Sequence, residues 1–136
     1  MDIDALRRQL TLHEGRTRSP YRDSEGKLTI GIGHNLDDRP LSDRVVDMIF
    51  EEDVGVALRD LALKMPWYVS LSERRQLVLA DMCFNLGIGK LLLFVKMIAA
   101  LRRGDWNDAA AEMLDSKWAR QVGNRALRLS TMMREG

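Results

Sequence analysis

The sequence has little of what secreted, disulfide-rich or membrane-spanning proteins need. Its 136 residues contain one cysteine, Cys83, which excludes an internal disulfide framework and a cysteine-rich zinc site. The longest nearly apolar run, residues 91–101, is too short to span a bilayer and carries Lys96. The first four residues are acidic and lack the positive flank and apolar stretch of a secretory signal. We therefore expect a cytoplasmic protein without stable membrane insertion.

The composition is that of a folded domain with an uneven distribution of charge. Hydrophobic residues make up 46% of the chain and charged residues 30%, which suffices for a buried core. Residues 1–60 carry a net charge of −4, and residues 61–136 carry +5. The basic half is consistent with attraction to a polyanion, either nucleic acid or a bacterial wall polymer, or with ordinary solvated helix faces.

Hydrophobic periodicity and turn residues predict a mixed fold. Residues 3–13 have helical spacing and stop before Gly15, whereas residues 15–35 combine turn residues with a short β-prone run. We expect a hairpin or three-stranded sheet there. After a Ser42 cap, a long helix with Val46, Ile49, Phe50, Asp53, Val54, Ala57 and Leu61 on its inward face is expected to run to Pro66.

The end signals in the remaining chain predict a series of short helices. Ser70 to Glu73 fits a capping box, the apolar run 91–101 is typical of a central buried helix, and Asn124 is the expected cap of the last helix. The predicted fold class is α+β and mostly α, in a single domain over residues 1–136. A small β-containing lobe (about 13–60) and a helical lobe (61–136) are joined by the long helix, and helix 3–13 packs on the second lobe. Such lobes leave a cleft suited to binding.

Three polar side chains surround the only β-containing segment: Glu14, Asp23 and Thr29. Cleavage of a glycosidic bond needs an acid that protonates the leaving oxygen and a carboxylate that activates or positions water. Glu14 at a helix end and Asp23 in a loop supply such a pair. Two acids at this spacing are, however, usually solvated surface residues.

The order and spacing of a longer motif carry more information. The motif consists of Glu14-Gly15, Pro20-Tyr21, Asp23, Gly26 and Thr29-Ile30-Gly31-Ile32-Gly33-His34. It resembles the phage-type lysozymes, and weaker matches continue at Phe84-Asn85-Leu86-Gly87, Trp118, Gly123, Asn124-Arg125-Ala126 and Arg128.

The resemblance implies a lysozyme-like fold and a muramidase that hydrolyses the β-1,4 bond between N-acetylmuramic acid and N-acetylglucosamine with inversion. It implies that Glu14 is the general acid, that Asp23 helps to activate the attacking water, and that Thr29 helps to hold that water. Inversion needs about 6.5–9.5 Å between the two carboxyl groups.

The resemblance also assigns roles outside this trio. His34 and Asp53 correspond to a structural ion pair, the alternative being a catalytic relay for which no nucleophile is suggested nearby. Asn85 matches an amide that shapes the cleft, the alternative being a helix-end hydrogen bond. Glu25 and Lys117 match a pair at the cleft mouth.

The glycines of Gly31-Ile32-Gly33 lack a nucleotide-binding fingerprint, so they serve either close approach of a sugar at Gly33 or strand conformation. The region from His34 to the Ser42 cap is shorter than in large family members, so a shorter lower wall of the cleft is expected.

No set of residues at metal-ligand spacing is present, so neither metal nor cofactor is expected. The expected partner is bacterial peptidoglycan, and not nucleic acid. A monomer is expected, and the lack of a signal or anchor predicts that it accumulates in the host bacterial cytoplasm. The family resemblance implies that it reaches the wall through a separate holin. The alternative is delivery on a virion or by a secretion apparatus.

Three other functions compete with this one. A lytic transglycosylase cuts the same bond with one acid, and the pairing of Asp23 with Thr29 argues against it. A catalytically inactive wall-binding lobe is disfavoured by the intact pair of acids. A nucleic-acid-binding module would use Arg120, Arg125, Arg128 and Arg134, but no base-reading motif accompanies them.

Overall fold

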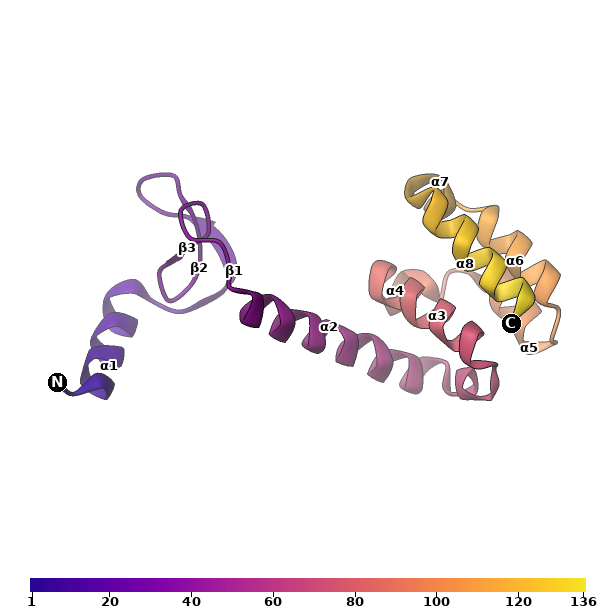
Figure 1. Ribbon diagram of the computed structural model, residues 1–136, viewed down its shortest axis with the longest axis horizontal. Helices are drawn as coiled ribbons and strands as arrows, with labels where there is room; N and C mark the ends of the chain where they lie inside the picture. Colours follow the sequence, from indigo (N-terminus) through magenta and orange to yellow (C-terminus); the bar gives the residue numbers. More distant parts are fainter. The chain divides into compact units, whose positions relative to one another are not determined.

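The computed structural model describes all 136 residues and divides them into two compact units, Met1–Ile49 and Phe50–Gly136 (Figure 1). Eight α-helices and one three-stranded antiparallel sheet confirm the predicted α+β, mostly α class. The predicted single domain, with helix 3–13 packed on the second lobe, stays a prediction, and each unit is described by itself.

The first unit combines one helix with the sheet. Helix α1 (Ile3–Glu14) is capped by Asp2, whose side chain accepts a hydrogen bond from the Ala5 amide, and it ends at Gly15. The strands β1 (Thr17–Arg22), β2 (Leu28–Gly31) and β3 (His34–Asn35) follow, with β2 in the centre. Thr29 on β2 pairs with Tyr21 on β1 and with Asn35 on β3. Of the two predicted alternatives, a hairpin or a three-stranded sheet, the structure has the three-stranded sheet.

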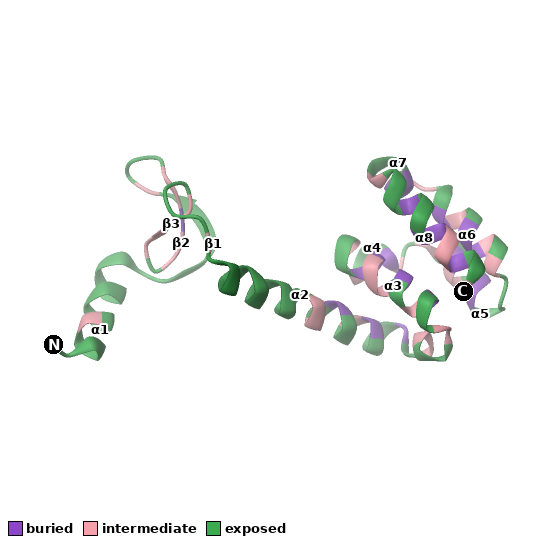
Figure 2. Cartoon of the chain, in the orientation of Figure 1, coloured by how far each residue is buried: buried purple, intermediate pink, exposed green.

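Helix α2 (Asp43–Lys64) begins at the predicted Ser42 cap and ends just before Pro66, whose ring cannot continue a helix. Its predicted inward face is buried only in the second half, at Ala57 and Leu61 (Figure 2). In the first half, Ile49 and Phe50 remain about half exposed.

The second unit is entirely helical. Its elements are the 3₁₀ helix η1 (Pro66–Ser70) and the helices α3 (Glu73–Leu86), α4 (Ile88–Leu91), α5 (Val95–Arg102), α6 (Trp106–Leu114), α7 (Lys117–Val122) and α8 (Asn124–Glu135).

Three local predictions in the second unit are wrong. The apolar run 91–101 is not one helix, because i→i−3 hydrogen bonds at Leu93 and Phe94 turn the chain between α4 and α5. The cap of α3 is Ser72 rather than Ser70, since the Ser72 hydroxyl accepts from an amide in the first turn. Asn124 is the first residue of α8 and makes no side-chain cap.

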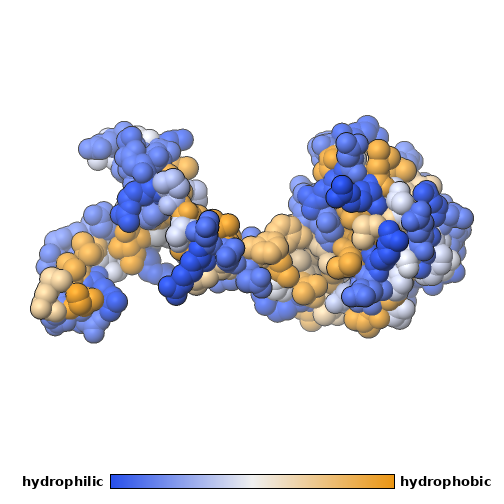
Figure 3. Space-filling view, viewed as in Figure 1, coloured by the Kyte–Doolittle hydropathy of each residue, from blue (hydrophilic) through white to orange (hydrophobic).

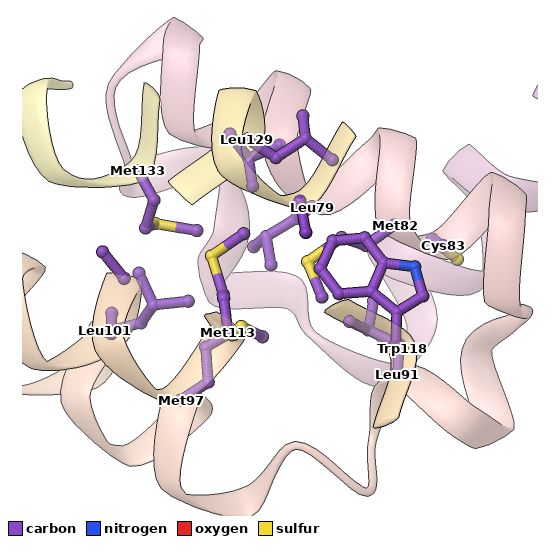
Figure 4. Packing of buried hydrophobic residues seen from close by; sticks show 14 of the residues in the cluster. Leu79, Met82, Cys83, Leu91, Met97, Leu101, Met113, Trp118, Leu129 and Met133 are labelled. Atoms are coloured by element: carbon purple, nitrogen blue, oxygen red, sulfur yellow. The ribbon is translucent and has the colours of Figure 1, made fainter. Parts of the chain in front are cut away.

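The hydrophobic core lies in the second unit and is rich in methionine. Met82, Met97, Met113 and Met133 are fully buried among leucine side chains, and Trp118 closes one side (Figure 4). Unbranched thioether side chains fill the irregular gaps between short helices. Cys83 is buried at the edge of this core, as expected for a small hydrophobic residue.

Both units also carry hydrophobic side chains among the hydrophilic residues of their surfaces (Figure 3). No helix combines the length and the apolar character that crossing a membrane would require.

Candidate active site

Glu14 is the last residue of α1, and its carboxylate lies against Gly33 in the turn between β2 and β3. A Cβ atom added to Gly33 would lie 2.7 Å from Glu14 Oε2, which is closer than real Cβ atoms approach an oxygen. The sharp turn at Gly15 ends the helix and leaves the Glu14 side chain beside the sheet. The structure therefore brings together two of the residues predicted from the sequence, Glu14 and Gly33. Only glycine leaves enough space at position 33 for the Glu14 carboxylate.

Asp23 begins the turn between β1 and β2, and its carboxylate is fixed by that turn. Asp23 Oδ1 accepts hydrogen bonds from the amides of Glu25 and Lys27, at 2.9 and 2.8 Å. Both bonds use Oδ1, so Oδ2 is left for an outside donor. Carboxylate bonds to backbone amides are charge-assisted, so they hold this group in one orientation.

Thr29 is buried on the central strand, and it is joined to the Asp23 turn through the carbonyl of Lys27. This oxygen accepts the Thr29 hydroxyl at 3.0 Å and the Asp23 amide at 2.9 Å. Because the Thr29 hydrogen is committed to the carbonyl, the Thr29 oxygen can act only as an acceptor toward another molecule. Asp23 and Thr29 are thus held in one small hydrogen-bonded unit.

The short segment after β3 binds back to this turn. Asp37 Oδ2 accepts from the Leu28 amide at 2.9 Å and lies 3.6 Å from the Arg22 guanidinium. The Lys27 ammonium lies 3.0 Å from Asp38 Oδ1. The hydrogen bond and the negative charge of Asp38 raise the pKa of Lys27, which keeps this ammonium charged.

His34 on β3 is bound within the first unit. Its Nε2 lies 2.9 Å from the carbonyl oxygen of Arg39. A carbonyl only accepts, so Nε2 carries a proton and Nδ1 remains for another partner. Asp53 belongs to the second unit, where it is exposed on α2. The His34–Asp53 ion pair stays a prediction.

The other predicted contact residues have different surroundings. Asn85, near the end of α3, accepts a hydrogen bond from the Trp118 indole at 2.8 Å through its Oδ1, which leaves the amide NH₂ group available. Lys117 is exposed at the start of α7 and lines a groove of about 660 Å³ in the helical unit. Glu25 is exposed in the Asp23 turn. Trp118 itself is buried, which agrees with a role in core packing.

The arrangement supplies an acid and two hydrogen-bond acceptors. Glu14 has a carboxyl group that can carry a proton, while Asp23 Oδ2 and the Thr29 oxygen are each able to accept a hydrogen bond from another molecule. No group of three or more His, Cys, Asp or Glu side chains is placed to hold a metal ion. Among the basic residues considered for nucleic acid, Arg125 is paired with Asp81 at 2.7 Å.

The structure adds two residues that the motif does not mark, Lys27 and Asp37. Lys27 contributes its backbone carbonyl rather than its side chain to the site. Any residue type has such a carbonyl, so the sequence cannot indicate this role. Asp37 lies nine residues after its partner Leu28. The only sequence signal is the acidic pair Asp37-Asp38 in a short connection, which is equally typical of a solvated turn.

Comparison with known proteins places these observations in a family. Residues 11–134 match the model of the family described as phage lysozyme. The chain is 24% and 26% identical, over 163 residues, to probable T4-type lysozymes 1 and 2 of Dictyostelium discoideum, covering 98% of this chain and 96% of each relative. It is 27% identical over 160 residues to the pre-baseplate central spike protein Gp5 of Enterobacteria phage T4. That match covers 97% of this chain but only 28% of the spike protein.

Proposed function

Because the chain belongs to the phage lysozyme family and is thus a peptidoglycan-hydrolysing enzyme, we propose that it is an inverting muramidase. Its substrate is the β-1,4 bond between N-acetylmuramic acid and N-acetylglucosamine, and Glu14, Asp23 and Thr29 carry the reaction. The observation that supports this proposal best is the hydrogen-bonded unit of Asp23 and Thr29. It leaves two acceptors, and no donor, for a water molecule.

The reaction is a single displacement. Glu14 gives its proton to the glycosidic oxygen as the bond to the anomeric carbon breaks. A water molecule donates one hydrogen to Asp23 Oδ2 and the other to the Thr29 oxygen, so its lone pair is directed to the anomeric carbon. Asp23 takes up the proton that this water loses. Glu14 ends ionised and Asp23 protonated, and exchange with solvent restores both.

Four further residues, two in each unit, are proposed to contact the saccharide. Gly33 lets the chain approach the sugar beside Glu14, and the free NH₂ group of Asn85 is suited to a carbonyl or hydroxyl oxygen of an N-acetyl sugar. Glu25 and Lys117 are both exposed and charged. Lysine lacks the planar fork of arginine, so any contact that Lys117 makes to a carboxylate is of the weaker, single kind.

The biological role we propose is lysis of a bacterial host by a monomeric enzyme. It acts on the cell wall after synthesis in the host cytoplasm, from which a separate holin releases it. The similarity to part of a phage spike protein raises a second route, in which the enzyme is carried on a particle. Clearing of purified peptidoglycan by free protein, together with a monomeric mass in solution, would favour the first route.

The test of the chemistry is a Glu14→Gln variant. The amide keeps the shape of the side chain but cannot deliver a proton, so we expect clearing of a peptidoglycan suspension to fall by at least about a hundredfold with an unchanged melting temperature. Glu52→Gln, which changes an exposed glutamate on α2, is the matched control and should clear the suspension at the normal rate.

Analysis of the products separates the remaining alternatives. Proton NMR during hydrolysis of soluble wall fragments should show the α-anomer first, because inversion turns the β-linkage into an α-product. A product lighter by one water would identify a lytic transglycosylase, and the β-anomer would identify a retaining enzyme. Normal clearing by Glu14→Gln would contradict the proposed role of Glu14.

A further inference from the structure

We propose that Asp37 is a positioning residue for catalysis, acting through one peptide group on Thr29 and the Asp23 turn. This inference rests on the proposed function of Asp23 and Thr29. Asp37 touches neither of them directly and lies in the short segment between β3 and α2. Its side chain is 42% exposed, so it has no part in a hydrophobic core.

The argument begins with the peptide bond between Lys27 and Leu28. The carbonyl at one end of this group accepts both the Thr29 hydroxyl and the Asp23 amide. The amide at the other end is the Leu28 N–H, which donates to Asp37 Oδ2 at 2.9 Å. Because a peptide group is planar and rigid, fixing its N–H also fixes the direction of its carbonyl. Asp37 therefore sets the direction in which the Thr29 hydroxyl donates.

Both backbone groups of Leu28 are bonded to the segment that follows β3. The Leu28 carbonyl accepts a hydrogen bond from the Leu36 amide. The Leu28 N–H donates to the Asp37 carboxylate. Arg22 lies 3.6 Å from the same Oδ2 and donates to the Gly26 carbonyl at 3.2 Å. The guanidinium thus ties the Asp37 carboxylate to the turn that carries Asp23.

The negative charge of Asp37 has an effect beyond geometry. An ionised acceptor forms a stronger bond to an N–H group than a neutral one does. Hydrogen bonds in a chain polarise one another, so a carboxylate at the amide end makes the Lys27 carbonyl a better acceptor for the Thr29 hydroxyl. The Thr29 oxygen is then held as an acceptor for the attacking water.

The test is a double-mutant cycle between Asp37→Ala and Thr29→Ala, with kcat and KM measured on soluble peptidoglycan fragments. We expect Asp37→Ala to lower kcat about tenfold and to leave KM within about twofold, because orientation and not binding is lost. Asp37→Asn keeps an oxygen acceptor but loses the charge, so its kcat should fall only about threefold. In the Thr29→Ala background, either substitution should lower kcat no further.

Asp38→Ala is the matched control. It removes the ion pair with Lys27 and the hydrogen bond to Asn35, but it leaves the Lys27–Leu28 peptide group untouched, so kcat should remain normal. Circular dichroism establishes which variants are folded, and Asp37→Asn decides the question if Asp37→Ala does not fold.

Unchanged kcat in a folded Asp37 variant, or the same fall in kcat with and without the Thr29 hydroxyl, would overturn the inference. Normal activity of both Glu14→Gln and Thr29→Ala would overturn the proposed function instead.

Discussion

At the scale of single residues, the site depends on the space left by a missing side chain. Gly33 has a φ of +68° and leaves room for the Glu14 carboxylate, whose Oε2, Cδ and Cγ atoms all lie within 3.0 Å of the position of an added Cβ. The carboxylate is the far end of a flexible side chain. If Gly33 carried a Cβ atom, the Glu14 side chain would therefore shift its position, and the unit would remain folded.

We therefore expect Gly33→Ala to reduce activity more than stability. The displaced Glu14 should lower the rate of peptidoglycan clearing by about tenfold or more. The left-handed backbone should lower the free energy of unfolding by about 1–2 kcal/mol. Clearing assays and thermal denaturation of the same preparations measure the two effects.

The matched control for this variant is Gly31→Ala. Gly31 has a φ of +70°, but no atom lies within 4 Å of an added Cβ. The same loss of stability is expected with normal activity. If both variants lost activity equally, the close approach of Glu14 to Gly33 would not be the cause.

At the scale of elements, Arg75 connects α3 to the end of α8. Its guanidinium donates to the carbonyls of Met133 and Arg134, at 2.8 and 3.1 Å, and lies 3.9 Å from the centre of the Trp106 ring. The last carbonyls of a helix have no hydrogen-bond partner within the helix, so Arg75 supplies donors for two carbonyls at the end of α8. Burial lowers the pKa of Arg75, yet these carbonyls and the aromatic face favour the charged form.

Replacement of Arg75 by alanine should lower the free energy of unfolding by about 2–4 kcal/mol, because two hydrogen bonds from a charged donor and a cation–π contact are lost together. Arg75→Lys should recover only part of this loss, since an ammonium lacks the planar fork. Denaturant titration measures both variants.

The neighbouring arginine provides the comparison for this prediction. Arg74 is exposed and lies 3.8 Å from Glu135, so Arg74→Ala should change the free energy of unfolding by less than about 1 kcal/mol. Equal losses for the two arginines would indicate that helix propensity, and not the contacts of Arg75, explains the effect.

At the scale of the whole molecule, the two units differ in how they are stabilised. All nineteen residues of the hydrophobic core lie between Ala57 and Met133. Taken by itself, the first unit has Thr29 as its only buried residue, and hydrogen bonds and ion pairs connect its strands and turns. Burial of apolar surface is the main favourable term in folding, so the second unit holds most of the stability.

A fragment of residues 43–136 should therefore fold alone and unfold cooperatively on heating, whereas a fragment of residues 1–42 should show no cooperative transition. Circular dichroism at 222 nm, the standard helix signal, follows both fragments. A cooperative transition in the shorter fragment would show that the sheet and α1 are stable without a core.

Much of the architecture was predictable because it is determined by local signals. The apolar spacing of residues 3–13 with Gly15 defines α1, and the cap at Ser42 with the stop at Pro66 defines α2. The motif around Glu14, Asp23 and Thr29 was sufficient for the family, because a fixed order of many residue types is specific even where each residue alone is not. The prediction of one helix over the apolar run 91–101 was wrong, because the run contains neither glycine nor proline to mark the turn between α4 and α5.

The sequence by itself thus determined the helices with strong end signals, the region that forms the sheet and the family to which the chain belongs. Only the tertiary structure decided that Gly33 makes room for Glu14 and that a single peptide group joins Asp37 to Thr29. The physical reason is that helix ends and turns depend on neighbouring residues, which a pattern records. The close approach of two side chains, and the bonds of a backbone amide, depend instead on atoms that the folded chain brings together from distant positions.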